Sequence, residues 1–145
     1  KLARISKTPG RTTEINFFEV EEGYKLLDLP GYGFAKSGQS RIKDWGSLLG
    51  EYFANRKALK GVLIFMDIRH PLKPIDLEMI KLCESFNIDY VAVLTKSDKV
   101  SKNIEAKIIH QVSNMTNAIE ILAISSLKKK GFEKLRKVLI GFKDE

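Results

Sequence analysis

The sequence has 145 residues, of which 43% are hydrophobic and 30% are charged, as expected for one folded domain with a polar surface. Apolar runs such as Val62 to Met66 are far shorter than the roughly 18 residues of a membrane span, and a single cysteine excludes an internal disulfide. The net charge of +7 is concentrated in residues 1–13 and 128–137. Such patches suit a polyanion, either RNA or nucleotide phosphate, although two solvated faces would account for them equally well.

Two strand-like segments come first along the chain. Ile15 to Glu21 and Tyr24 to Asp28 are joined by the tight turn Glu22-Gly23. This pattern predicts an antiparallel hairpin near the N-terminal end of the sequence.

From residue 45 onward, apolar spacings typical of helices alternate with short apolar runs typical of buried strands. The predicted strands are Val62 to Ile68, Tyr90 to Leu94 and Ile119 to Ile124. The predicted helices carry these apolar stripes: Trp45, Leu48, Leu49, Tyr52 and Phe53; Ile75, Met79, Leu82, Cys83 and Phe86; Ile104, Ile108, Val112 and Met115; Phe132, Leu135, Leu139 and Phe142. The alternation predicts the α/β class, a mostly parallel sheet with helices on both faces.

Helix boundaries are marked by residues with known end preferences. Pro74 can open the second helix, Asn87 can stop it, and Ser101 can cap the third. Cys83 falls on the apolar side of the second helix, so we predict that it is a core residue.

Ligands of open α/β sheets bind at the carboxyl ends of the strands. Asp28-Leu29-Pro30-Gly31 follows the second strand. A carboxylate there can hold Mg²⁺ through water, and the glycine lets a backbone amide approach a phosphate. An ordinary turn is the alternative, because Asp, Pro and Gly all favour turns.

Two further segments follow later strands. In Thr95-Lys96-Ser97-Asp98, the carboxylate can accept hydrogen bonds from N1–H and the 2-amino group of guanine, which adenine cannot supply. The stem of Lys96 can lie along the base plane. In Ser125-Ser126-Leu127-Lys128, small residues allow backbone amides to reach the guanine O6. Each segment alone would also fit a polar loop.

A fourth segment, Thr8 to Thr13, precedes the hairpin. A threonine in such a loop can bind Mg²⁺ through its hydroxyl and sense the terminal phosphate, as GTPase switches do, although a disordered basic loop is the alternative. The order of the four segments along the chain predicts a GTP site.

The runs Lys7 to Thr12, Ile15 to Phe18 and Asp28 to Lys36 resemble those of the EngB (YihA/YsxC) family of bacterial ribosome-assembly P-loop GTPases. Asp67 to Lys73 and Ser125 to Lys129 support the same resemblance. These motifs extend from end to end of the chain and are far more specific than general GTPase signatures.

The resemblance implies a Ras-like P-loop fold and a bacterial cytoplasmic GTPase that matures the large ribosomal subunit, with a link to cell division and septation. GTP or GDP and Mg²⁺ would be its cofactors, and precursor ribosomal RNA its partner. We expect a monomer with no membrane association. By motif match, the implied roles are as follows: catalytic, Thr12 and Gly31; metal-binding, Thr12 and Asp28; nucleotide-binding, Gly10, Arg11, Thr12, Thr13, Asp28, Leu29, Pro30, Gly31, Thr95, Lys96, Ser97, Asp98, Ile124, Ser125 and Ser126.

Two positions depart from family or GTPase patterns. Thr13 stands where the family usually has glutamine, so we assign it no role of its own beyond belonging to the implied nucleotide-binding segment. Tyr32 occupies the place where many GTPases have a glutamine that orients the attacking water. We therefore expect slow intrinsic hydrolysis, raised by a partner such as the ribosome or by a monovalent cation.

The phosphate-binding motif Gly-x-x-x-x-Gly-Lys-Ser/Thr does not occur in the sequence. In the family it lies upstream, with a central strand expected between the strand ending at Asp28 and the strand Val62 to Ile68. We therefore expect one GTP-binding domain over residues 1–145 that is N-terminally incomplete, inactive by itself and part of a longer protein. The alternative is a non-catalytic module that binds ribosome or RNA.

Overall fold

The computed structural model describes residues 16–20, 24–28, 49–55 and 59–142. The chain divides into two compact units, Lys1–Leu49 and Gly50–Glu145, and each is considered by itself. The prediction of one domain over the whole chain stays a prediction.

The first unit contains the predicted hairpin. Strand β1 (Asn16–Val20) pairs antiparallel with β2 (Tyr24–Asp28), so that Asn16 lies opposite Asp28. The hairpin prediction is confirmed. Of the next predicted helix, residues 49–55 are helical, and its remaining positions Trp45 and Leu48 lie outside the described residues.

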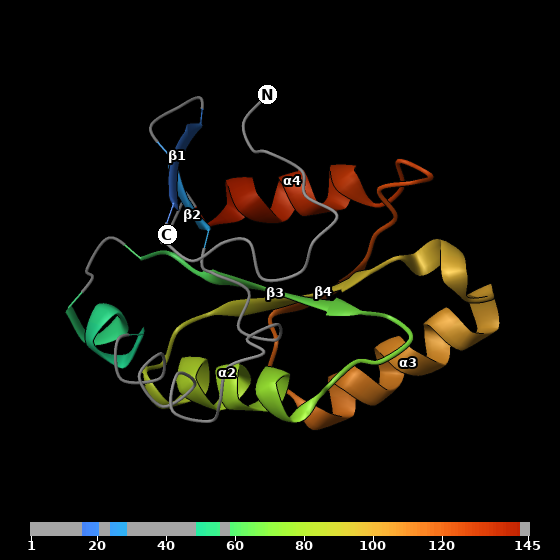
Figure 1. Cartoon of the computed structure of the whole chain (residues 1–145), viewed down its shortest axis with the longest axis horizontal. Coiled ribbons are helices and arrows are strands. Elements are labelled where there is room, and N and C mark those ends of the chain that lie inside the picture. Colours follow the sequence, from blue (N-terminus) through green and yellow to red (C-terminus); the bar gives the residue numbers. More distant parts are fainter. Residues whose placement is uncertain (1–15, 21–23, 29–48, 56–58, 143–145) are drawn as a thin grey trace. The chain divides into compact units, whose positions relative to one another are not determined.

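The second unit is a parallel three-stranded sheet in the order β3-β4-β5 with helices on both faces. Figure 1 shows α4 on one face and α2 and α3 on the other, which confirms the predicted α/β class. The elements are β3 (Val62–Asp67), α2 (Pro74–Ser85), β4 (Tyr90–Thr95), the short 3-10 helix η2 (Ser97–Lys99), α3 (Lys102–Met115), β5 (Glu120–Ala123) and α4 (Phe132–Gly141).

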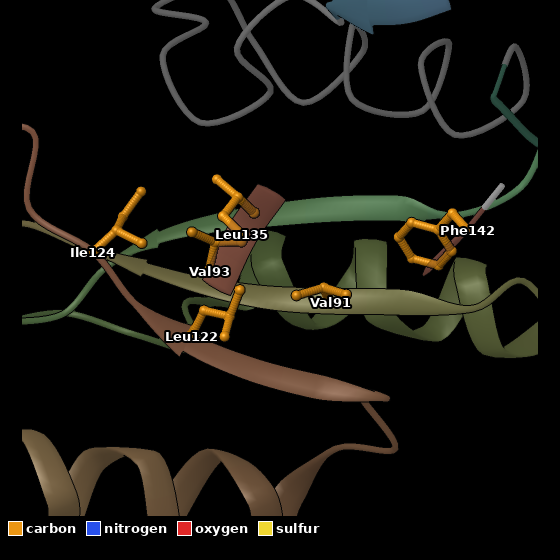
Figure 2. Packing of buried hydrophobic residues seen from close by; sticks show 6 residues of the cluster. All are labelled: Val91, Val93, Leu122, Ile124, Leu135 and Phe142. Atoms are coloured by element: carbon orange, nitrogen blue, oxygen red, sulfur yellow. The ribbon is translucent and has the colours of Figure 1, made fainter. Parts of the chain in front are cut away.

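Strand β4 forms the centre of the core. Its residues from Tyr90 to Leu94 are all buried, as its continuous apolar run predicts. On the α4 side, the buried cluster comprises Val91, Val93, Leu122, Ile124, Leu135 and Phe142, shown in Figure 2. Its side chains come from β4, β5 and α4, together with Ile124 just after β5 and Phe142 just after α4. Burying these apolar side chains holds α4 against the sheet.

The predicted helix boundaries are confirmed. Pro74 is the first residue of α2, and Asn87, just beyond its end, has a left-handed φ of 50°. The Ser101 hydroxyl accepts a hydrogen bond of 3.3 Å from the Ile104 amide and caps α3. Cys83 is fully buried, and burial raises its pKa to about 12, so the thiol is an uncharged core group as predicted.

Two burial predictions are wrong in part. Strand β3 was expected to be buried on both faces, but Phe65 is 50% exposed whereas Ile64 and Met66 are buried. On α3, the predicted apolar stripe is buried at Val112, while Ile104 and Met115 are about half exposed. Helix α3 lies against β5 at one edge of this sheet, and β3 forms its other edge, so each receives less cover than β4.

Among the helices that the structure describes, none has the length and apolar character needed to cross a membrane.

Candidate functional site

The three parallel strands of the second unit end at a common edge. Asp67 of β3 is in register with Thr95 of β4, and Leu94 is in register with Ala123 of β5. The pairing of β4 with β5 extends to the residue after β5, because the Ile124 amide donates a 2.8 Å hydrogen bond to the Leu94 carbonyl. Side chains that follow the strands are therefore gathered along one line, the arrangement expected of a ligand site in an α/β sheet.

Asp98 and Ser125 meet at this edge. The Ser125 hydroxyl donates a 2.5 Å hydrogen bond to Oδ1 of Asp98, and the Asp98 side chain is only about 10% exposed. This hydrogen bond is the main cause that lowers the pKa of Asp98, with the charges of Lys99 and Lys128 adding to it. Asp98 is therefore an oriented carboxylate anion at neutral pH.

Ser125 is itself fixed by the loop that follows β5. It forms an isolated antiparallel bridge with Lys130, in which each amide donates a 3.0 Å hydrogen bond to the other's carbonyl. The Lys128 amide donates to the Ser125 hydroxyl at 3.1 Å. Since this hydroxyl accepts from Lys128, its own proton is free to point at Asp98.

The segment between β4 and η2 is held from both sides. The Thr95 hydroxyl donates to the Met66 carbonyl at 3.2 Å, and the Ser97 amide donates to the Ile124 carbonyl at 3.0 Å. Between them, Lys96 has the left-handed conformation φ 58°, ψ 38°. Such a backbone is unfavourable for a residue with a side chain and is often found at functional sites.

Asp67, Arg69 and Lys96 form a second polar group at the same edge. The Arg69 guanidinium binds Asp67 through two of its nitrogens, with Nε donating to Oδ1 at 3.0 Å and Nη2 donating to Oδ2 at 2.7 Å. The Lys96 ammonium lies 3.0 Å from Oδ2 of the same carboxylate. Arg69 first, and then Lys96, hold the pKa of Asp67 far below its usual range.

The oriented Asp98 carboxylate can act as an acceptor for two neighbouring N–H groups of a flat ligand. Guanine presents such a pair, N1–H and the 2-amino group, whereas adenine has a lone pair at N1. An acceptor left without a donor in a desolvated site costs about 1–3 kcal/mol or more, so a carboxylate with this orientation would favour guanine over adenine.

Of the predicted nucleotide-binding residues, those of the two guanine segments are brought together. They are Thr95, Lys96, Ser97, Asp98, Ile124, Ser125 and Ser126. Asp28 is the exposed last residue of β2 in the first unit. The other predicted positions lie outside the described residues: Gly10, Arg11, Thr12, Thr13, Leu29, Pro30 and Gly31. Their roles stay predictions.

Of the two predicted Mg²⁺ ligands, the structure describes Asp28, and the position of this residue is compatible with binding Mg²⁺. Mg²⁺ keeps much of its water shell and is usually held by one or two carboxylates together with phosphate oxygens. An exposed carboxylate at the end of a strand, as Asp28 provides, suits this mode. Among the described residues, no group of three His, Cys, Asp or Glu side chains could hold a metal.

Two features of the site escaped the sequence analysis. Asp67 and Arg69 received no role, although Asp67 ends a strand just as Asp28 does. Ser125 was expected to act through its backbone, whereas its side chain binds Asp98. The rule that ligands lie at strand ends would have found Asp67, but no sequence signal shows which side chains pair across a sheet.

Comparisons with known proteins identify the family of the chain. A family model described as "50S ribosome-binding GTPase" matches residues 1–96. A probable GTP-binding protein EngB of Sodalis glossinidius is 44% identical over 142 residues, which cover 95% of this chain and 67% of that protein. The protein of the same name from Salmonella newport is 45% identical and is covered to 68%.

Solved structures show the same fold. A crystal structure of a probable GTP-binding protein EngB matches with a TM-score of 0.74 and 22% identity, covering 98% of this chain and 86% of that one. The elongation factor SelB of Methanococcus maripaludis, bound to a GTP analogue, matches with a TM-score of 0.60 and 23% identity, covering 92% and 29%. The fold agrees with the family match over residues 1–96 and with the 44–45% identities, which show that the chain belongs to the EngB family of P-loop GTPases.

Proposed function

We propose that this protein binds GDP and GTP with Mg²⁺ and hydrolyses GTP slowly to drive a switch in the assembly of the large ribosomal subunit. The observation that carries the nucleotide part is the Ser125–Asp98 hydrogen bond, which orients a carboxylate at the ligand edge of the sheet. The ribosomal part is supported by the description of the matching family, a 50S ribosome-binding GTPase. Family resemblance further supports a cytoplasmic location and a role in cell division and septation.

Several of the predicted site residues have a definite task in this proposal. Asp98 accepts two hydrogen bonds from the guanine edge, and Ser125 keeps its carboxylate in place. The stem of Lys96 lies against the base, and the amide of Ser126 faces the guanine O6. Mg²⁺, held by Thr12 and Asp28, would neutralise charge on the phosphates.

Nucleotide binding can be tested with a variant that should prefer a different base. In full-length protein, fluorescent GDP binding should be displaced by GTP but not by ATP. Asp98→Asn replaces an acceptor by an amide that can also donate, so it should weaken GDP binding and improve binding of xanthosine diphosphate, which has a carbonyl at position 2. Unchanged preference for GDP in Asp98→Asn would refute the assigned role of Asp98.

A basic surface supports an RNA partner. Six cationic residues in the loop before α4 and on α4 are all exposed: Lys128, Lys129, Lys130, Lys134, Arg136 and Lys137. Exposed cations bind phosphates, and each phosphate contact makes the logarithm of affinity fall with the logarithm of salt by roughly 0.7–0.9. We therefore propose that this surface contacts ribosomal RNA through its backbone.

The RNA contact can be tested with matched triple variants. Replacing Lys128, Lys129 and Lys130 by alanine should weaken binding to large ribosomal subunits and reduce the salt slope by about 2–3. Replacing Lys60, Lys81 and Lys107, three exposed lysines elsewhere, serves as the control. Equal effects of the two variants would show that only net charge matters.

Hydrolysis is tested by turnover with and without ribosomal subunits. Because Tyr32 has no side-chain amide to orient water, we expect slow turnover of the protein alone and a marked rise with large subunits or K⁺. Tight subunit binding without any nucleotide binding would favour a non-catalytic ribosome-binding module.

A further inference from the structure

We propose that Asp67, itself held by Arg69, is a positioning residue that sets the Lys96 side chain in the orientation needed to lie along the guanine base. This inference rests on the proposed function, because it gives a role to a residue outside the guanine segments within the same site. It starts from the contacts of a single carboxylate.

Arg69 fixes the orientation of the Asp67 carboxylate. Besides the two guanidinium contacts, the Arg69 amide donates a 3.0 Å hydrogen bond to Oδ1. A planar guanidinium bound through two nitrogens allows little rotation of its partner. The Asp67 side chain is 17% exposed, so water competes weakly for it. The remaining capacity of Oδ2 is taken by the ammonium of Lys96 at 3.0 Å.

Lys96 would otherwise be poorly ordered. Its side chain is 57% exposed, and an exposed lysine samples many rotamers. Its backbone is already fixed in the left-handed conformation by the hydrogen bonds of Thr95 and Ser97, so the side chain holds most of the remaining freedom. Binding the ammonium to Asp67 fixes both ends of the four-carbon stem. A stem ordered before the ligand arrives loses less entropy on binding, which raises affinity without a new contact to the ligand.

The position of Asp67 suits this role. It is the last residue of β3 and lies in register with Thr95, the residue before Lys96. Asp67 makes its contacts with cations, and Asp98 is held separately by Ser125. The two carboxylates at this edge therefore have different tasks, one toward the ligand and one toward Lys96.

The experiment is a double-mutant cycle on the full-length protein, with the dissociation constant and dissociation rate of a fluorescent GDP analogue as readouts. Asp67→Asn keeps the shape but removes the charge. We expect it to weaken GDP binding about tenfold, mainly through faster dissociation. In the Lys96→Ala background the same change should alter affinity less than about twofold, since there is no ammonium left to position. Asp89→Asn, an exposed carboxylate just before β4, is the control and should change nothing.

A purely structural role of Asp67 would give a different result. It would lower the unfolding temperature of the nucleotide-free protein and weaken binding equally with and without Lys96, and that outcome overturns the proposal. Arg69→Gln provides a second variant, expected to weaken binding in the same direction and again to lose its effect in Lys96→Ala. If the wild-type protein binds no GDP, the proposed function and this inference both fail. If it binds and Asp98→Asn alters base preference but Asp67→Asn has no effect, only this inference fails.

Discussion

The hydroxyl of Ser125, which follows β5, donates a 2.5 Å hydrogen bond to Asp98, which lies in η2 at the same sheet edge. Ser125 is 1% exposed and receives a hydrogen bond from the Lys128 amide, so its hydroxyl has both a donor and an acceptor. At the candidate base site, this side-chain contact therefore joins η2 to the loop after β5.

Ser125→Ala should weaken GDP binding roughly tenfold, because the Asp98 carboxylate loses the hydrogen bond that orients it. The folded pKa of Asp98 lies below its ordinary value of 3.8, so the contribution of this contact to stability is present above that value and is lost as pH falls through the lowered pKa. In Ser125→Ala the pKa of Asp98 should rise toward 3.8, and GDP binding should be lost at a higher pH on acidification. Binding titrations across acidic pH test this. Ser85→Ala, which removes a hydroxyl bonded within its own helix, should shift neither affinity nor pH profile.

Ser97→Ala should stabilise the folded protein. Its hydroxyl oxygen is buried and makes no hydrogen bond within the described part of the chain. A buried polar group without a partner costs about 1–3 kcal/mol, so its removal should raise the free energy of unfolding by an amount on the order of 1 kcal/mol. Urea unfolding of the nucleotide-free protein measures this. A loss of stability in Ser97→Ala would instead contradict the prediction and show that the Ser97 hydroxyl makes a stabilising contact.

Tyr90→Phe should destabilise the second unit by about 1–3 kcal/mol, because the buried Tyr90 hydroxyl joins two elements. It donates to Glu84 of α2 at 2.6 Å and accepts from the Asn117 amide at 2.9 Å. Burial, and then the hydrogen bond to Glu84, raise the pKa of Tyr90 from 10.0 to about 12. The folded state thus holds this proton more tightly, so the associated stability is full below pH 10 and declines as pH rises toward 12.

Alkaline unfolding curves give the test of Tyr90. The wild-type protein should lose stability between pH 10 and 12, and Tyr90→Phe should lose less over the same interval. Cys83, whose pKa is raised from 9.0 to about 12, contributes to this decline in both proteins, so a Cys83→Ala background isolates the tyrosine. Identical pH slopes with and without the hydroxyl would contradict the assignment.

The gathering of the guanine segments could be predicted from sequence. Parallel strands of similar length place their carboxyl ends together, so finding the strands that end at Thr95 and near Ile124 was enough to bring Asp98 and Ser125 to one edge. The hairpin followed in the same way from two short strands and a tight turn. Both predictions depend on the periodicity of apolar residues and on the order of the strands along the chain, and both can be read from the sequence.

The rest depended on contacts that periodicity does not encode. An apolar stripe shows which side of an element faces the sheet but not how far neighbours cover it, hence the exposure of Phe65 and Ile104. The Asp67–Lys96 contact joins the last residue of β3 to the residue after β4 through a long lysine side chain, which could reach many possible partners. Lys96 and Lys129 have left-handed backbone conformations, which cannot be predicted from residue type because tertiary contacts impose them.

Gly131→Ala should be the most damaging of the changes considered. Gly131 has φ 84°, and a Cβ there would lie 2.5 Å from the backbone carbonyl oxygen of Ala123, which cannot move without disturbing β5. The left-handed backbone and the overlap together should cost on the order of 3 kcal/mol of unfolding free energy. Since Gly131 follows the Ser125–Lys130 bridge, GDP binding should weaken as well. Gly141→Ala, at the last residue of α4, is the matched control; a Cβ there meets nothing within 4 Å, and the change should be neutral or slightly stabilising. Equal unfolding midpoints for the two variants would show that the loop after β5 accommodates a side chain, and would weaken the case that this loop holds Ser125 rigidly against Asp98.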